Sequence, residues 1–403
     1  MNKKYVYISV AAIMAVVIVG YIFYGGLSTE TSPSTTESSS SLTQVTFAVS
    51  PFQDTLLPIV GKEKGWYREE GLDVEFKILG WTEVMEALSA GGVDVAVNNM
   101  SAVVSTHEQN PQITYWYGLN PFSDGFALMI RPDSKMKTLE QIRKEVDSHE
   151  EAIKKTAAQL KGKTVVTTAM TDMEQGVAAV AQRGGLNFKE DIRILDLNPD
   201  EGLAAFLRGE GDAYIGGVPQ RSRAAKEGMR SMITGADLGP PPINGLVTTK
   251  DFASENRDVM LKLMRVWFRT VNHMNRNLED GASIIIERLN STSGAQFTLE
   301  DYRQVWNDYE EFPASPSEVE KMILEPGGRF YWEARWKDCN RYFHDIKGVI
   351  SKPVDPKSAF WMRRAHKAYT KEYESGSTQQ EAAVYGNDAE MHMSDKKKPA
   401  TVQ

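Results

Sequence analysis

Polar and aromatic side chains that directly follow predicted β-strands are the residues of this sequence that could hold a small molecule. Asn and Thr offer both hydrogen-bond donors and acceptors, and Trp or Phe can cover an apolar or planar part of a ligand. The candidates in the first part of the chain are Phe52, Gln53, Asp54, Trp81, Asn98, Asn99, Asn120 and Phe122. The candidates in the second part are Thr168, Met170, Thr171, Asp172, Asn198, Gly217 and Val218.

Three of these residues have a simpler alternative. Trp81 could instead be a helix-entry residue that packs into the protein, and Asn98 and Asn99 could end a strand with local backbone hydrogen bonds. Both alternatives stay open on the sequence alone.

The sequence favours binding over catalysis or metal coordination. The residues His107, His273, His344 and His366 are scattered without the spacing of metal ligands, and Cys339 is the single cysteine. We therefore expect no catalytic residues, no metal and no cofactor. The phosphate-binding motif GxxxxGK[ST] does not occur, so ATP-driven work would need its energy from another chain.

A motif that occurs twice predicts the elements that position the binding residues. Residues 87–99 (ALSAGGVDVAVNN) and 205–217 (AFLRGEGDAYIGG) each indicate the end of an amphipathic helix, a glycine stop, an acidic residue and a short strand. The shared pattern is [Leu/Phe]-x-x-Gly-x-x-Asp, with Gly91 and Gly209 as its glycines. Two matching units predict two similar lobes, and open α/β sheets bind ligands at the carboxyl ends of their strands.

Composition and charge are those of an ordinary globular protein. The 403 residues are enough for two substantial cores, and 41% of them are hydrophobic and 25% charged. The formal net charge is −8. An acidic chain is a poor partner for nucleic acid or for anionic lipid, so we expect neither.

The amino-terminal segment predicts a membrane anchor. Residues 5–24 (YVYISVAAIMAVVIVGYIFY) carry no charge and have tyrosines at both ends, which suits a single span. A cleaved signal peptide is the alternative, but its apolar region is usually shorter and followed by an Ala-x-Ala-like site. The lysines within residues 1–4 place that end in the cytoplasm and the rest outside. Residues 25–43 are a Ser/Thr-rich linker, and residues 374–403 a polar, disordered tail.

Alternating strands and helices predict an α/β fold with mostly parallel sheets flanked by helices. The strand expected at residues 126–131 leaves the first lobe, and the strand at 243–248 returns to it. We divide the chain into lobe 1 at residues 44–127, lobe 2 at 128–245, and a helical continuation of lobe 1 at 246–373.

Several segments resemble the extracytoplasmic solute-binding proteins of ATP-driven importers. They are KEKGWYREEGLDVEF, the [Leu]-x-x-Gly-x-x-Asp turn, RPDSKMKTLEQI, QLKGKTV and GEGDAYIGG, in the order expected for that family. The most similar group serves nitrate, sulfonates, taurine and pyrimidine precursors of thiamine. The resemblance covers about residues 44–373 and implies a two-lobed type II periplasmic binding protein fold with two crossovers. This chain departs from the family at residues 144–158, which lengthen one link, and at Gln159, which replaces an Asp.

The predicted site lacks the features expected for an anion. Relatives that bind sulfonate or nitrate can use free amides at a helix amino terminus. Here Thr171 and Glu174 fit a capping box that would satisfy those amides, and Asp172 adds negative charge. No arginine lies on a predicted cleft loop, so we expect a neutral or cationic, partly planar ligand.

The sequence therefore predicts a membrane-anchored, extracytoplasmic solute-binding subunit that captures a small organic solute between two lobes. Its partners would be a permease and an ATPase subunit. Two other functions remain: a ligand-sensing ectodomain of a signalling complex, and an enzyme of thiamine-pyrimidine synthesis on the same fold. The enzyme needs a histidine and a cysteine-rich segment that this sequence does not show.

Overall fold

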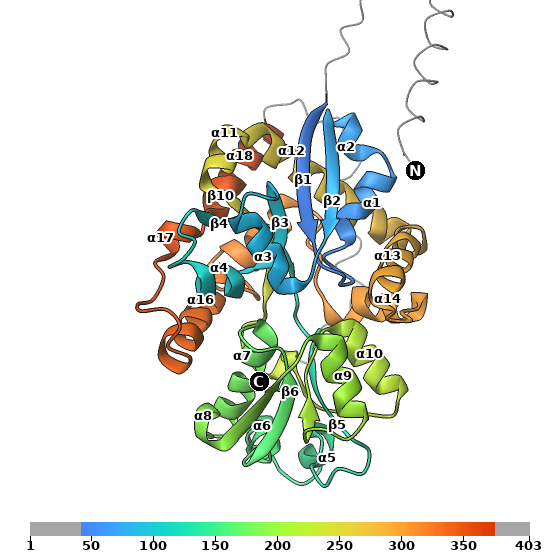
Figure 1. Ribbon diagram of the computed structural model, residues 1–403, viewed down its shortest axis with the longest axis vertical. Helices are drawn as coiled ribbons and strands as arrows, with labels where there is room; N and C mark the ends of the chain where they lie inside the picture. Colours follow the sequence, from blue (N-terminus) through green and yellow to red (C-terminus); the bar gives the residue numbers. More distant parts are fainter. Residues whose placement is uncertain (1–41, 375–403) are drawn as a thin grey trace, which may run out of the picture. The chain divides into compact units, whose positions relative to one another are not determined.

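The computed structural model describes residues 42–374, which lie in a compact unit that begins at Leu42 (Figure 1). The predicted segments 1–4 and 5–24, and nearly all of the linker and tail, fall outside the described residues. Within residues 42–374, no helix combines the length and the apolar character that a membrane span requires.

The first sheet contains five strands in the order β2-β1-β3-β10-β4. Their bounds are β1 Thr43–Val49, β2 Leu72–Ile78, β3 Val95–Asn99, β4 Ile113–Pro121 and β10 Ile243–Thr249. Strand β10 runs antiparallel to both of its neighbours, whereas β1 pairs in parallel with β2 and β3. Every residue of β3 and β4 is buried, as expected for strands covered on both faces.

The second sheet repeats this plan in the order β7-β6-β8-β5-β9. Its strands are β5 Ala127–Ile130, β6 Lys163–Thr167, β7 Ile192–Asp196, β8 Ala213–Tyr214 and β9 Arg230–Thr234. Strand β5 is the antiparallel member and lies between β8 and β9. Each sheet therefore has four strands that run in one direction and one antiparallel strand between two of them. This agrees with the predicted mostly parallel sheets.

The repeated motif has the same structural role in both sheets. In the first sheet, Gly91 adopts φ +71° after the helix, and the Asp94 carboxylate accepts a hydrogen bond from the Thr46 backbone N–H at 2.8 Å. In the second, Gly209 adopts φ +106°, and Asp212 accepts from the Thr164 N–H at 2.8 Å. Each aspartate thus fastens its turn to the neighbouring strand, and each glycine takes a backbone conformation that a side chain would disfavour.

The chain passes between the sheets twice. Residues 122–126 lead from β4 to β5, and residues 235–242 lead from β9 to β10. The two crossing segments are hydrogen-bonded to each other, from Phe122 N to Pro242 O at 2.8 Å and from Gly235 N to Phe126 O at 3.0 Å. We use lobe 1 for residues 42–121 and 243–374, and lobe 2 for residues 127–234.

These crossings differ slightly from the division drawn from the sequence. Ala127, assigned above to lobe 1, pairs with Thr234 in the second sheet. Residues 243–245, assigned above to lobe 2, already pair in the first sheet. The strands extend beyond the most hydrophobic residues because backbone hydrogen bonding continues into the polar strand ends.

Helices cover both faces of the first sheet (Figure 1). The amphipathic α12 packs its apolar side against α1, α2, α13 and α18, and buries Leu263, Trp267 and Val271. The helices of lobe 1 are α1 Leu57–Glu63, α2 Trp66–Glu69, α3 Trp81–Ser89, α4 Met100–Thr106, α11 Lys250–Glu255, α12 Arg257–Arg276, α13 Leu278–Ser293, α14 Leu299–Gln304, α15 Pro316–Val319, α16 Trp332–Asn340, α17 Pro356–Ala359 and α18 Met362–Glu374. Short π-helical turns are η2 Val305–Tyr309, η3 Glu320–Leu324 and η4 Arg341–Ile346.

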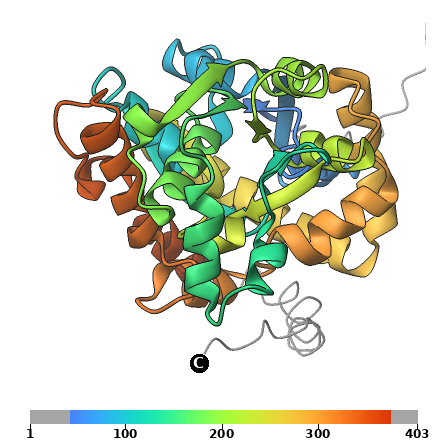
Figure 2. The same cartoon turned by 90° about the horizontal axis from the view of Figure 1, so that it is seen from below.

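In lobe 2, α6 and α7 pack together on one side of the sheet, and α9 and α10 on the other (Figures 1 and 2). The helices are α5 Leu139–Arg143, α6 His149–Ala158, α7 Asp172–Arg183, α8 Phe188–Asp191, α9 Pro199–Leu207 and α10 Val218–Lys226, with a 3-10 turn η1 Gly235–Asp237. The segment 144–158, which lengthens the link relative to the family pattern, supplies α6. Gln159 then fastens this segment by exchanging hydrogen bonds with the Lys137 backbone at 2.8 and 3.0 Å.

Candidate functional site

A cavity of about 250 Å³ lies between the strand ends of the two lobes. Lobe 1 contributes the segments after β1, β2 and β4, and lobe 2 those after β6, β7 and β8. These are the carboxyl ends of strands, where open α/β sheets bind ligands. The volume is slightly below the range of about 300–1,000 Å³ that is typical of small-molecule sites.

Most of the residues predicted from the sequence line this cavity. They are Phe52, Gln53, Asp54, Trp81, Phe122, Thr168, Thr171, Asp172, Asn198, Gly217 and Val218. The structure therefore brings together side chains that are far apart in sequence and that come from both lobes. Whether they contact a solute is a separate prediction.

The predicted residues Asn98, Asn99, Asn120 and Met170 do not line the cavity. The Asn98 Nδ2 group donates to the Trp81 carbonyl at 3.3 Å, and its Oδ1 accepts from the Asn99 N–H. Asn99 caps α4 by accepting from Ala102 N at 3.3 Å. For this pair, the alternative of strand termination with local hydrogen bonds is the one that the structure shows.

Met170 lies outside the cavity for a backbone reason. It adopts φ +62°, and its side chain is 37% exposed. Its N–H donates to the Glu174 carboxylate at 2.7 Å. The left-handed turn that this bond stabilises carries the side chain to solvent.

Further residues line the cavity that the sequence analysis did not select. They are Pro51, Gly80, Thr82, Glu83, Met173, Pro199, Asp200, Gln220 and Asn244. Most lie next to a selected residue in the same loop and could have been found by widening each loop by one or two positions. Asn244 could not, because it lies at the amino end of the antiparallel β10. The rule used for the prediction covers only the carboxyl ends of strands.

A buried hydrogen-bond network lies behind Asp54. The Asn120 Nδ2 group donates to Asp54 at 3.1 Å and to Glu310 at 2.9 Å. Gln53 Nε2 donates to Glu310 at 2.5 Å, and Asn244 Nδ2 donates to Asp54. All five side chains are at most 5% exposed. Asn120 thus belongs to the wall behind the cavity rather than to its surface.

The two carboxyl groups of this network differ in their protonation. Burial and the nearby charge of Asp54 hold the pKa of Glu310 well above its usual range. Burial also raises the pKa of Asp54, but hydrogen bonds from Asn120 and Asn244 oppose that rise. Two adjacent carboxyl groups cannot both ionise cheaply, and the pKa of Glu310 is held the higher, so the folded pair favours one negative charge.

The cavity has an acidic lining. Asp54, Glu83, Asp172 and Asp200 contribute carboxyl groups, and no Lys, Arg or His is among the described residues that line it. Burial raises the pKa of Asp172, and the guanidinium of Arg335 opposes that rise. Arg335 lies on α16 in the final third of the chain, so no local pattern connected it with the Asp172 loop.

Two of the helices that begin at the cavity bring their own carboxylates to their amino termini. Glu83 of α3 accepts from the Gly80 N–H at 2.9 Å. In α7, Thr171 Oγ1 accepts from Met173 N at 3.2 Å, and Glu174 accepts from Met170 N. The predicted capping box is therefore wrong in its register, although both side chains satisfy backbone amides as expected. The difference arises because the left-handed Met170 turns its own N–H toward Glu174.

Aromatic rings form the apolar part of the lining. Phe52 and Trp81 meet edge to face with ring centroids 5.7 Å apart, and Phe122 also lines the cavity. Trp81 is the first residue of α3 and also reaches the cavity. Its two possible roles are therefore compatible.

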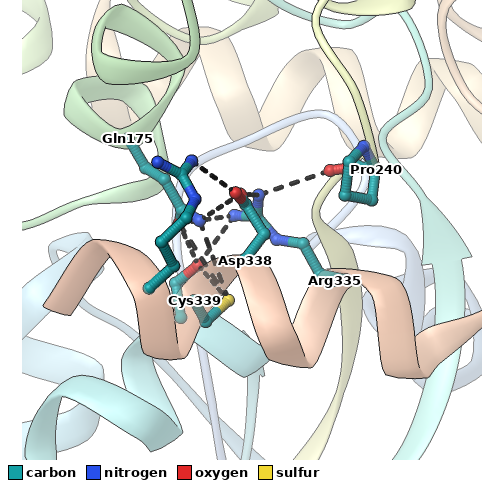
Figure 3. Close-up of polar contacts among 7 residues, drawn as sticks. Gln175, Pro240, Arg335, Asp338 and Cys339 are labelled. Atoms are coloured by element: carbon teal, nitrogen blue, oxygen red, sulfur yellow. Dashed lines mark hydrogen bonds and ion pairs between the residues drawn. The ribbon is translucent and has the colours of Figure 1, made fainter. Parts of the chain in front are cut away.

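The helix that carries Asp172 also joins the two lobes. Gln175 Nε2 donates to Asp338 at 2.6 Å, and Arg335 Nη2 donates to Gln175 Oε1 at 2.9 Å (Figure 3). The preceding residue, Glu174, accepts hydrogen bonds from Tyr342 Oη at 2.6 Å and Lys347 Nζ at 2.8 Å. We call these contacts between α7 and the α16–η4 segment the α7–α16 junction.

Comparison with known proteins gives one family match and several matches of fold. The model of the NMT1-like family matches residues 38–288. No curated protein matches the sequence.

Solved structures give the same fold at low sequence identity. The periplasmic aliphatic sulphonate-binding protein SsuA of Escherichia coli is 16% identical and has a TM-score of 0.60, with 79% of this chain and 92% of that chain covered. The alkanesulfonate-binding SsuA of Xanthomonas axonopodis pv. citri, bound to MOPS, is 17% identical with a TM-score of 0.59, covering 79% and 98%. The periplasmic nitrate-binding protein NrtA of Synechocystis PCC 6803 is 13% identical with a TM-score of 0.57, covering 84% and 90%.

Proposed function

Because this chain belongs to the NMT1-like family and has the fold of periplasmic binding proteins, we propose that it is the solute-binding subunit of an ATP-driven importer. It captures a small organic solute outside the cytoplasm and delivers it to a membrane permease that a separate ATPase drives. The observation that carries this proposal is the cavity lined by strand ends from both lobes.

The two crossing segments support a binding cycle. Within residues 42–374, the chain crosses between the lobes in two segments, 122–126 and 235–242. Rotation about these segments would open the cavity. A solute that touches both lobes binds the closed form better than the open form and therefore shifts the population toward closure. The permease would recognise the closed form.

Residues 5–24 would hold the protein at the membrane. Their length and composition suit a single span, with the lysines of residues 1–4 on the cytoplasmic side. The linker at residues 25–43 would then let the binding unit reach its permease.

The proposal is tested by binding and scattering on the purified protein. Isothermal titration with taurine, nitrate, aminopyrimidines and amines should identify a solute, which mass spectrometry should recover unchanged. Small-angle scattering should show a smaller radius of gyration in its presence. Conversion of the solute into a product would contradict the proposal and favour an enzyme.

A further inference from the structure

Buried, unpartnered hydrogen-bond acceptors belong to residues that line the cavity. Three buried amide side chains line it, Gln53, Asn244 and Gln220, which are 1%, 5% and 3% exposed. Their oxygens Gln53 Oε1, Asn244 Oδ1 and Gln220 Oε1 have no hydrogen-bond partner among residues 42–374. A buried acceptor without a donor is costly, so three of them around one cavity point to a ligand that supplies donors.

The orientation of these three amides is fixed by carboxylates. Gln53 donates its nitrogen to Glu310 at 2.5 Å, Asn244 donates to Asp54, and Gln220 donates to Asp200 at 3.1 Å. Exchanging the nitrogen and oxygen would place the amide oxygen of Gln53 or Asn244 against Asp54, and that of Gln220 against Asp200. The amide nitrogens are therefore committed to the acidic groups, and the oxygens remain available.

The third oxygen lies beside Gly217, another residue that lines the cavity. A Cβ added to Gly217 would lie 3.2 Å from Gln220 Oε1 and 3.0 Å from the Phe52 ring. Gln220 of lobe 2 and Phe52 of lobe 1 thus both pack against Gly217, which brings an acceptor and an aromatic ring together at this side of the cavity.

The charge of the cavity agrees with its acceptors. Asp54 and Asp172 come from opposite lobes and are close enough for the charge of Asp54 to raise the pKa of Asp172. No Lys, Arg or His is among the described residues that line the cavity, and Arg335, which does not line it, offsets only Asp172. A cation between the two carboxyl groups would relieve their repulsion and draw the lobes together.

Two of the helix amino termini at the cavity are already met by carboxylates. The amides at the start of α3 and α7 are met by Glu83 and Glu174 from the same helices. In α9 and α10 no side chain caps the first turn, but Pro199 and Pro219 each remove one N–H. A ligand anion would therefore meet carboxylates at the starts of α3 and α7.

From these observations we infer that the solute is a small organic cation whose charged group carries N–H donors, as in an amine or amidine. Its charged end lies between Asp54 and Asp172 and donates to the oxygens of Gln53, Asn244 and Gln220. Its apolar or aromatic body lies against Phe52 and Trp81, whose ring faces favour a nearby cation. This inference rests on the proposed solute-binding function and specifies the class of solute.

The test compares matched compounds by isothermal titration of the full chain in detergent. The cations are phenethylamine, benzamidine and agmatine, the neutral counterparts are 2-phenylethanol and benzamide, and the anions are taurine and nitrate. We expect at least one cation to bind about tenfold or more tightly than its neutral counterpart, because a charged hydrogen bond adds that much affinity.

Variants then locate the charged group. Asp172→Asn should weaken binding of the cation by about tenfold or more, whereas Asp133→Asn, at an exposed position outside the cavity, should leave it unchanged. Gln220→Met removes one acceptor without touching the Asp54 network, and should weaken binding of the cation severalfold. This second variant keeps the test valid if the buried Asp172→Asn protein folds poorly.

Each outcome decides between the two proposals. Tighter binding of taurine or nitrate, or equal binding of neutral and cationic partners, would overturn the inferred cation but leave the solute-binding function in place. If no compound of the three classes binds, the result would count against the solute-binding function itself. The inference of a cationic solute would then be rejected as well.

Discussion

At the residue scale, the least ordinary feature is a buried pair of carboxyl groups in the polar wall behind the cavity. Asp54 and Glu310 accept hydrogen bonds from the amides of Gln53, Asn120 and Asn244, and neither forms an ion pair among residues 42–374. Burial and the charge of Asp54 hold the pKa of Glu310 well above its usual range, so the folded pair favours a single negative charge.

This pair predicts how stability depends on pH. The pKa of Glu310 is raised in the folded protein by burial and by Asp54. In the unfolded chain it ionises near its usual pKa of about 4.3, so above that pH the folded state holds more protons. The stabilisation is therefore complete below about pH 4 and is lost as pH rises toward the folded pKa, by at most about 1.4 kcal/mol per pH unit.

Glu310→Gln should remove this dependence, because glutamine has no proton to lose. Between about pH 5 and 8, the free energy of unfolding of the natural protein should fall relative to that of the variant. Urea denaturation at a series of pH values measures both profiles. Parallel profiles for the two proteins would mean that Glu310 is ionised in the folded state.

Gly217 predicts a second effect at this scale, on binding. Its backbone angle of φ −68° suits any residue, so an alanine there is limited by space alone. The new methyl would press on Phe52 and Gln220 at 3.0 and 3.2 Å. We expect Gly217→Ala to weaken solute binding by about tenfold and to change the free energy of unfolding by no more than about 1 kcal/mol.

Gly92→Ala is the matched control, since its Cβ would meet the Ala87 carbonyl at an ordinary 3.4 Å and Gly92 does not line the cavity. Titration calorimetry should show unchanged affinity for this variant. Equal affinities for both variants would place the solute away from Gly217.

How far the site could be predicted depends on where each residue lies. Thr171, Asp172 and Gly217 follow strands whose pattern is visible locally, so a rule about strand ends found them. Asn244 and Arg335 join the site only because β10 and α16 pack there, and those contacts span more than a hundred residues of sequence. Asn98 and Asn99 also end a strand, but they form hydrogen bonds with nearby backbone groups and do not line the cavity, so their role in binding stays a prediction.

At the element scale, α7 has two different surfaces. Thr171, Asp172 and Met173, at its start, line the cavity, whereas Glu174 and Gln175 contact α16 and η4 of lobe 1. The same turn of helix therefore carries cavity-lining residues and an interlobe contact. In this structure the junction and the cavity are present together, so the junction favours the conformation in which both lobes line the cavity.

Lys347 tests this coupling. It pairs with Glu174, whose side chain is 1% exposed, and Lys347→Met would leave that carboxylate buried without its cation. We expect the free energy of unfolding to fall by about 2 kcal/mol and the solute affinity to fall severalfold. Denaturation and calorimetry measure the two changes separately.

The control for this prediction is Lys337→Met on α16. Lys337 is 75% exposed and pairs with Glu333 of its own helix. Its loss should change the free energy of unfolding little, because surface ion pairs contribute little to stability. If Lys347→Met behaves like Lys337→Met, the α7–α16 junction does not support closure.

The elements themselves were largely predictable where the sequence repeats. The glycines and aspartates of the two motifs fixed a helix end, a turn and a strand in each lobe, and Asp94 and Asp212 make equivalent bonds. The antiparallel positions of β10 and β5 within their sheets could not be predicted from the sequence, because the local pattern of a strand does not show which strands it pairs with. The register of the α7 cap was missed for a similar reason, since it depends on the unusual backbone of Met170.

At the scale of the whole molecule, the binding unit and the amino-terminal segment should be separable. We expect the full chain to sediment with membranes and to require detergent for release, because residues 5–24 suit a bilayer span. A chain that begins at residue 42 should remain in the supernatant and bind the solute with unchanged affinity, since residues 42–374 contain the whole cavity lining.

Intact-mass measurement on the full chain checks the same prediction in another way. An uncleaved anchor leaves the mass of the complete sequence. A mature protein that lacks residues 1–24 or more and is recovered without detergent would show that the segment is a signal peptide.

The insertion of β10 also affects how the protein is made. Strands β3 and β4 share β10 as a neighbour, and β10 follows them in the chain by more than a hundred residues. While the ribosome is still adding lobe 2, the facing edges of β3 and β4 have no strand between them, and exposed edges recruit other chains. Residues 95–121 can therefore complete their part of the sheet only after β10 has been made.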